Sequence, residues 1–218
     1  MSEHGLARFI DRYTTEYIRI YPHPIERVWR AIIDPAEFSI WFIPGRLDPR
    51  VGGAYWFGDD GFQGVVGAIQ LPRLLRLDDA NQGTIFQYEL EEVEGGTRMR
   101  FTNHIPPSGV HAEVPGDLGG DLPGGPGTPW KPGFVGGFHA MFYELTDFLD
   151  GVPVGSRLPP TEMSAVAQHW ADMAGRHGIG LTSEQLARIV RGLRGSERWN
   201  ELNKIYRAHI KATLPPAD

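Results

Sequence analysis

Two neighbouring runs of alternating residues constrain the fold of this chain more than any other feature. Thr84 to Glu92 and Thr97 to Ile105 alternate apolar and polar side chains, and the segment 93–96 (VEGG) joins them. Alternation is typical of half-buried strands, and glycine supplies the positive φ angles of a tight turn. We predict a β-hairpin with an inward apolar face and an outward charged face. The inward residues are Phe86, Tyr88, Leu90, Met99, Phe101 and Asn103, and the outward residues are Gln87, Glu89, Glu91, Arg98, Arg100 and Thr102.

Several shorter elements precede this hairpin. Thr14 to Tyr21 alternates like a strand, and in the segment 24–35 (PIERVWRAIIDP) apolar residues recur at helical spacing between two prolines. A second short helix is expected at Ala36 to Trp41. Glycine and proline then separate short apolar runs that read as strands. These expected strands are Gly53 to Gly58, Gly64 to Gln70 and Arg73 to Leu77.

A long apolar helix is expected at Phe134 to Leu149, ended by Gly151. Its pattern assigns Glu144, Thr146 and Asp147 to positions away from the apolar face, and His139 to the flank of that face. The chain is therefore α+β: an antiparallel sheet must curve around this helix, and apolar space that stays open between them is the default ligand site. The apolar face consists of Phe138, Met141, Phe142, Leu145, Phe148 and Leu149.

Glycine and proline also mark the chain's divisions. They occupy 15 of the 28 positions in 106–133, which predicts a long loop, either a mobile insertion or a flap held by Val110 and Trp130. A second Gly/Pro-rich stretch, 151–160, precedes a tail with 9 basic and 6 acidic residues, against 12 and 21 before it. We predict one domain over 1–151 and a helical extension over 152–218.

The extension contains three expected helices. Thr161 to Arg176 is one, and Thr182 with Gln185 matches a capping box that would begin another. The third carries an apolar stripe that could pack on its own domain, cover the cavity or form a homodimer face. The stripe consists of Trp199, Leu202, Ile205, Tyr206 and Ile210.

Composition excludes several classes of protein. A net charge of −6 argues against nucleic acid as a partner, and the absence of cysteine removes thiolate chemistry and disulfides. None of the 8 histidines forms a metal-binding pair at helical spacing, and no nucleotide-binding or nucleophile-elbow motif occurs, so we expect neither metal nor cofactor. No apolar run approaches a membrane span, and the first residues lack a signal peptide's apolar region, so we expect a cytoplasmic protein without membrane contact.

One segment resembles a known family. Residues 21–59 are similar to the opening of the START-like helix-grip superfamily (SRPBCC, Bet v 1-like), particularly the branch named for the activator of Hsp90 ATPase and its polyketide cyclase-like relatives. The resemblance extends over residues 14–151, and it implies a curved sheet gripping the last helix. Phe138, Ala68 and Asn103 stand where the family commonly has Trp, an acidic residue and His. The matching positions are Pro24, Val28, Trp29, Ala31, Asp34, Pro35, Trp41, Gly52, Gly53, Pro72, Leu74, Gly96, Thr97, Arg98, Gly137, Leu145 and Leu149.

The resemblance implies binding of a hydrophobic small molecule, aromatic or of polyketide type, with cyclase or aromatase chemistry as an extension of it. The alternative is a non-enzymatic protein-interaction module, co-chaperone-like or an adaptor through the added helices. Proton transfer would need one donor or acceptor such as Tyr55, Tyr88 or His139, although no catalytic residue can be assigned. The expected ligand-binding residues are Tyr55, Phe57, Phe86, Tyr88, Phe101, Asn103, Phe138, His139 and Phe142.

Overall fold

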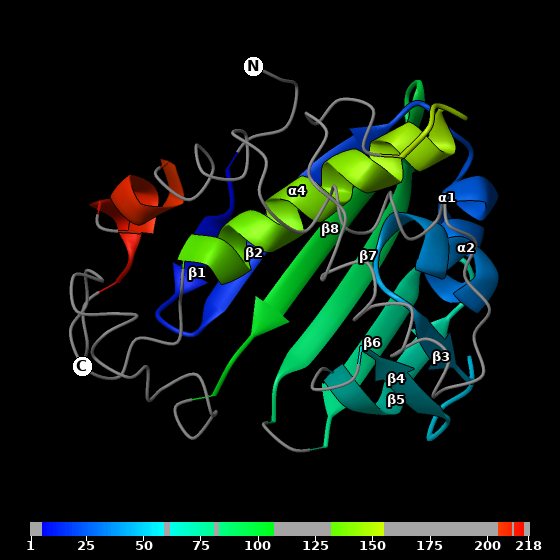
Figure 1. The fold of residues 1–218 in the computed structure, drawn as a ribbon, viewed down its shortest axis with the longest axis horizontal. Helices are drawn as coiled ribbons and strands as arrows, with labels where there is room; N and C mark the ends of the chain where they lie inside the picture. Colours follow the sequence, from blue (N-terminus) through cyan, green and yellow to red (C-terminus); the bar gives the residue numbers. More distant parts are fainter. Residues whose placement is uncertain are drawn as a thin grey trace, which may run out of the picture.

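A computed structural model describes residues 6–58, 62–80, 83–106, 132–154, 205–210 and 212–215 (Figure 1). Most of the Gly/Pro-rich stretch, with Val110 and Trp130, lies outside these residues. So do the expected helix 161–176, the capping box at Thr182 and two residues of the tail stripe, Trp199 and Leu202. The elements are β1 (Arg8–Asp11), β2 (Thr14–Tyr21), α1 (Ile25–Ile33), α2 (Pro35–Trp41), β3 (Gly45–Leu47), β4 (Ala54–Phe57), β5 (Phe62–Gln70), β6 (Leu74–Asp79), β7 (Ile85–Val93), β8 (Gly96–His104) and α4 (Pro132–Leu149).

The strands form an eight-stranded sheet in the order β1-β2-β8-β7-β6-β5-β4-β3, with every neighbouring pair antiparallel. Figure 1 shows α4 lying diagonally across one face of this curved sheet, and α1 and α2 packed toward its β3–β6 side. The predicted α+β helix-grip architecture is confirmed. Every strand, helix and turn named in the prediction up to residue 106 has its counterpart, apart from shifts at the ends.

The β7–β8 hairpin has the predicted faces but a tighter turn. Val93 pairs with Gly96, so two residues form the turn rather than the expected four. Gly95 adopts a φ of 84°, a left-handed conformation that costs glycine little. The inward side chains of both strands are buried, and Arg98 and Arg100 on the outer face form ion pairs with Glu91 and Glu89.

Two short edge strands, β1 and β3, are additions to the predicted set. Each has only three or four residues, too few for alternation to be visible. In β2, the alternation of residues does not show which set of side chains points into the core. Pairing with β8 turns Tyr17 and Arg19 inward, which leaves Ile18 and Ile20 on the outside, 47% and 55% exposed.

Helix α4 is buried more completely than its pattern indicates. Glu144 and Asp147, expected away from the apolar face, are nevertheless both buried. The physical reason is that α4 is buried on more than its sheet-facing side, whereas the spacing of apolar residues along a helix identifies only its most apolar face. The helix ends as predicted: Gly151 has a φ of 69°, and the N–H of Val152 donates to the carbonyl of Asp147 at 2.9 Å.

The described part of the tail packs against its own chain. Residues 205–210 are helical and lie beside β1 (red in Figure 1), with Tyr206 and Ile210 fully buried. His209 Nε2 lies 2.6 Å from the carbonyl oxygen of Ala7, and the guanidinium of Arg12 donates to the carbonyl of Pro215 at 3.0 Å. Tyr206 and Ile210 are therefore buried by contacts within their own chain and are not exposed to form a dimer face. The domain boundary at residue 151 and dimerisation through other tail residues stay predictions.

Candidate functional site

An aromatic crevice lies between the inner face of the sheet, α2 and α4. Its volume is about 10 Å³, room for roughly one water molecule. The open hollow expected from the fold is thus almost filled by side chains in the part of the chain that the structure describes. The residues lining the crevice are Phe38, Phe42, Phe57, Phe62, Leu77, Phe86, Tyr88 and Phe138.

Helix α2 supplies one wall because its start and end are both fixed. The carboxylate of Asp34 accepts a hydrogen bond from the N–H of Ala36 at 2.9 Å and caps the helix. At the other end, the indole N–H of Trp41 donates to the carbonyl of Ala31 in α1 at 2.9 Å. This places Phe38 in a stacked contact with Phe57 of β4, with 4.5 Å between ring centroids. The neighbouring Phe42 stays partly exposed, at the edge of the crevice.

The opposite wall consists of rings from the central strands. Phe62 meets Phe86 edge-on, with 4.8 Å between centroids, and Phe86 lies 5.9 Å from Phe138 of α4. Phe101 lies behind Phe138 at 5.0 Å and Phe142 beyond it, so both support the crevice without lining it. Because Phe62 is only partly buried, the crevice has a second movable ring at its edge.

A row of polar side chains borders the crevice on the sheet. Tyr55 pairs with Gly64, Gly64 pairs with Asp79, and the N–H of Asp79 donates to the carbonyl of Thr84. Cross-strand neighbours lie side by side on one face, so Tyr55, Asp79 and Thr84 share a row. Burial raises the pKa of Tyr55 far above its usual value, and the nearby negative charge of Asp79 adds to this effect. The phenol therefore stays protonated at neutral pH and acts as a hydrogen-bond donor.

The next row contains a buried amide beside the crevice. Asn103 pairs with Phe86, which pairs in turn with Leu77, and both of these neighbours line the crevice. Asn103 is 0% exposed. Within the described ranges, neither its Oδ1 nor its Nδ2 has a hydrogen-bond partner, and the same holds for the hydroxyls of Tyr55 and Thr84. Buried polar atoms in proteins are normally paired, so this group of unpaired atoms calls for an explanation.

The structure gathers most of the residues predicted for the site. Phe57, Phe86, Tyr88 and Phe138 line the crevice, whereas Tyr55 and Asn103 border it. The lining residues that the sequence did not single out are Phe38, Phe42, Phe62 and Leu77. Leu77 ended a predicted strand and Phe38 lay in a predicted helix, so their apolar character was visible, but only the packing of α2 across the sheet, seen in the contact of Phe38 with Phe57, brings them to one site.

His139 has a different environment from the one expected. Its Nδ1 lies 2.8 Å from the hydroxyl of Tyr206 and 3.3 Å from a guanidinium nitrogen of Arg19. Arg19 is itself buried over the rings of Tyr17 and Phe142, and burial lowers its pKa. An imidazole between these groups connects α4 to the tail helix and β2 instead of the crevice. These contacts place His139 in the packing of the tail helix, and its role in ligand binding stays a prediction.

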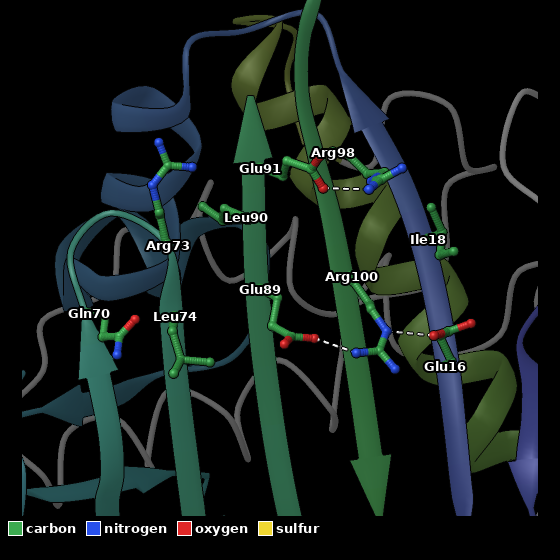
Figure 2. A pocket seen from close by; sticks show the side chains of 10 residues that line it. All are labelled: Glu16, Ile18, Gln70, Arg73, Leu74, Glu89, Leu90, Glu91, Arg98 and Arg100. Atoms are coloured by element: carbon green, nitrogen blue, oxygen red, sulfur yellow. Dashed lines mark hydrogen bonds and ion pairs between the residues drawn. The ribbon is translucent and has the colours of Figure 1, made fainter. Parts of the chain in front are cut away.

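A second concave surface lies on the outer face of the sheet. Figure 2 shows ten side chains around a groove of about 520 Å³, on the face turned away from α4. Its most buried member, Glu16, forms ion pairs with Arg8 at 2.5 Å and with Arg100 at 2.6 Å. The hydrogen bonds that Arg100 donates to Glu16 and then to Glu89 raise the pKa of Arg100. The residues of the outer groove are Glu16, Ile18, Gln70, Arg73, Leu74, Glu89, Leu90, Glu91, Arg98 and Arg100.

The described residues contain neither a metal-binding cluster nor a membrane-spanning helix. There, no cluster of three or more His, Cys, Asp or Glu side chains is arranged to hold a metal ion. None of the helices that the structure describes is both long and apolar enough to cross a membrane.

Fold and sequence comparisons agree on the class of this protein. The sheet that grips α4 is the START-like helix-grip (SRPBCC, Bet v 1-like) fold, and the solution structure of CalU16 from Micromonospora echinospora shows it at 17% identity, with a TM-score of 0.55 over 98% of this chain and 97% of that one. Within this class, residues 22–118 match the family described as "Activator of Hsp90 ATPase homolog 1-like protein". The resemblance inferred from the sequence is thus confirmed in that segment.

Two further solved structures are similar to this chain. A protein from Mesorhizobium loti is 21% identical, with a TM-score of 0.49 over 63% of this chain and 97% of that one. A protein described as an Hsp90 activator from Plasmodium falciparum is 20% identical, with a TM-score of 0.42 over 46% of this chain and 79% of that one. Among curated proteins, none matches.

Proposed function

We propose that this protein binds a hydrophobic, aromatic small molecule between α2, α4 and the inner face of the sheet. The observation that carries the proposal is the crevice itself: seven of its eight lining residues are aromatic, and the lining comes from α2 and the residue after it, β4, β5, β6, β7 and α4. Ligand sites are concave, mostly apolar and edged by a few polar groups. A polyketide-type molecule is the ligand class that the START-like resemblance favours.

The ligand would enter by displacing rings. A space of about 10 Å³ does not admit an aromatic molecule, but Phe42 and Phe62 are partly exposed and can rotate outward without leaving a buried void. Binding then replaces contacts between rings by contacts between rings and ligand, so the apolar area removed from water grows. We expect binding to accompany a shift toward an open arrangement of α2.

The polar groups of the crevice favour binding over proton transfer. Burial raises the pKa values of Tyr55 and Tyr88 far above neutral pH, so both phenols are donors and neither is a ready base. His139, the third proton carrier considered, contacts Tyr206 instead. Cyclase-type chemistry would therefore rest on shaping a reactive ligand, with these phenols donating hydrogen bonds.

Filling the crevice tests the proposal. Naphthalene binding, measured by saturation-transfer NMR, should be detectable in the wild-type protein and at least ten-fold weaker in Leu77→Phe, which adds a ring to the crevice wall. Phe148→Ala is the matched control, because that half-buried ring lies under Arg27 near the other end of α4. Equal binding by Leu77→Phe and the wild type, or no binding by the wild type, would contradict the proposal.

The outer groove supports a second candidate, a protein-interaction module. Ile18 in the groove and Ile20 beside it are exposed, on a face flanked by charged pairs, and most groove residues fall within the segment that matches the Hsp90-activator family. A chaperone of the Hsp90 type is the partner that this match suggests. We expect Ile18→Glu to abolish stimulation of Hsp90 ATPase activity if this candidate is right, whereas Val51→Glu, at an exposed position outside the groove, should not. Absence of stimulation by the wild type would reject it.

A further inference from the structure

We propose that the polar row and the amide of Asn103 form a subsite for the uncharged polar end of the ligand, a group that both donates and accepts hydrogen bonds, such as a carboxamide. The inference rests on the proposed function, because it defines which aromatic molecule the crevice would accept. Three features of the inner face support it.

The first feature is Gly64, a position in the polar row that carries no side chain. Gly64 lies between Tyr55 and Asp79 in the polar row, and a Cβ at this position would come within 1.9 Å of the carbonyl oxygen of Asp78. The position therefore stays bare. The rings of Phe62 and Phe86, one row to either side, meet above it. Outward rotation of Phe62 would uncover this place, with the polar side chains around it.

The second feature is the chemistry of the unpaired atoms. The amide of Asn103 offers one acceptor and two donors, and the hydroxyl of Thr84 offers both functions. Both side chains are at least 98% buried, and neither is bonded to any residue that the structure describes. A carboxamide pairs with another amide through two parallel hydrogen bonds. A ligand carrying only acceptors or only donors would leave part of this set unpaired, which is costly in a buried site.

The third feature is charge. The carboxylate of Asp79 is buried in the same row and receives a hydrogen bond from the N–H of Gln63 at 3.3 Å. The negative charge of Asp79 acts on Tyr55 in the same row, because it adds to the rise in the pKa of that phenol. A ligand carboxylate would be repelled at this short range in a medium of low dielectric constant. An uncharged end group avoids that repulsion.

Three probes of one shape test the subsite: naphthalene, 2-naphthamide and 2-naphthoate. At pH 7, isothermal titration of the full chain should give at least ten-fold tighter binding for 2-naphthamide than for either of the others. Asn103→Leu and Thr84→Val should lower the affinity for 2-naphthamide to that of naphthalene and leave naphthalene binding unchanged. Thr102→Val is the matched control, because Thr102 neighbours Asn103 on β8 but belongs to the outer face.

The outcomes separate the subsite from the proposed function. Equal affinities for naphthalene and 2-naphthamide would overturn the subsite, leaving a bound water as the partner of Asn103, and would leave the aromatic site standing. If 2-naphthoate bound most tightly of the three, the subsite would also be overturned, because the charge of Asp79 should repel its carboxylate. If none of the three probes binds, the proposed function itself fails. Circular dichroism checks that each variant is folded, and should Asn103→Leu not fold, Thr84→Val alone decides.

Discussion

The hydroxyl of Tyr206 accepts a hydrogen bond from the backbone N–H of Ala7 at 2.9 Å, across 199 residues of chain. The same hydroxyl lies 2.8 Å from Nδ1 of His139, to which it can donate. One side chain thus joins the tail helix to the residue before β1 and to α4. Since all three groups are buried, these bonds link the two ends of the described chain to the helix that the sheet grips.

Replacing this hydroxyl should destabilise the fold. We expect Tyr206→Phe to lower the free energy of unfolding by about 1 to 3 kcal/mol, because the N–H of Ala7 would be left buried without its acceptor. Urea denaturation followed by tryptophan fluorescence measures the change. Tyr13→Phe, which removes a hydroxyl from a half-buried tyrosine, should cost less than about 0.5 kcal/mol. If both substitutions had the same effect, the hydrogen bond from Ala7 would not contribute measurably to stability.

Alkaline pH should unfold the protein through its buried tyrosines. Burial raises the pKa of Tyr206 to about 12 and that of Tyr17 well above its usual value. The folded-state pKa lies above the unfolded value of about 10, so the folded protein keeps the phenol proton up to a higher pH than the unfolded chain does. The contribution of the buried tyrosine to the free energy of unfolding is therefore complete below pH 10 and is lost as the pH rises toward 12. Tyr206 alone should contribute on the order of 2 kcal/mol. Stability measured from pH 8 to 11.5 should fall less steeply in Tyr206→Phe than in the wild type.

The two arginines of the β8 outer face should differ in importance. Arg100 neutralises Glu16, a carboxylate only 3% exposed, whereas Arg98 pairs with Glu91 in solvent. We expect Arg100→Met to cost about 1 to 3 kcal/mol, since it weakens the compensation of a buried charge, and Arg98→Met less than about 1 kcal/mol. Denaturation in 0.1 M and 1 M salt should show a difference that persists at high salt. Similar costs for both substitutions would contradict the special role of Glu16.

Two glycines of β5 should respond differently to a methyl group. At Gly64 a Cβ meets the backbone oxygen of Asp78, which cannot move without breaking the sheet, so Gly64→Ala should cost about 3 kcal/mol or prevent folding. At Gly67 the three atoms nearest to a Cβ all belong to the carboxylate of Asp78, a side chain that can rotate away. Gly67→Ala should therefore cost less than about 1 kcal/mol. Thermal denaturation of both variants distinguishes these outcomes, and an equal fall in melting temperature would contradict the argument.

Local patterns were sufficient for the hairpin and for α4. Alternation over nine residues placed Tyr88 and Phe101 on one face, and helical spacing placed Phe138 on the face toward the sheet. The same patterns failed for residues whose burial depends on contacts with distant segments of the chain. They placed Asp147 away from the apolar face and gave no reason for its burial, and they gave no reason for Ile18 to be outside and Arg19 inside.

The candidate site divides in the same way. Its residues from β4, β7, β8 and α4 followed from alternation, helical spacing and the resemblance, since each shows an inward position within its own element. Phe38 and Phe42 could not be assigned to it, because their contact with Phe57 depends on how α2 packs across β4. The contacts of His139 could not be predicted, because its partners, Arg19 and Tyr206, lie 120 and 67 residues away in the chain.

The amino-acid sequence by itself determined which of the longer described segments are strands and helices, which face of the hairpin is apolar, and the helix-grip class, because these depend on periodicity and on ordered local motifs. Only the tertiary structure decided that the crevice between α2, α4 and the sheet is nearly full among the described residues, that unpaired polar atoms of Tyr55, Thr84 and Asn103 lie beside it, and that the tail helix is bonded to the residue before β1. Those properties depend on strand register and on side-chain volumes meeting across distant parts of the chain, and neither quantity is encoded in any single stretch of residues.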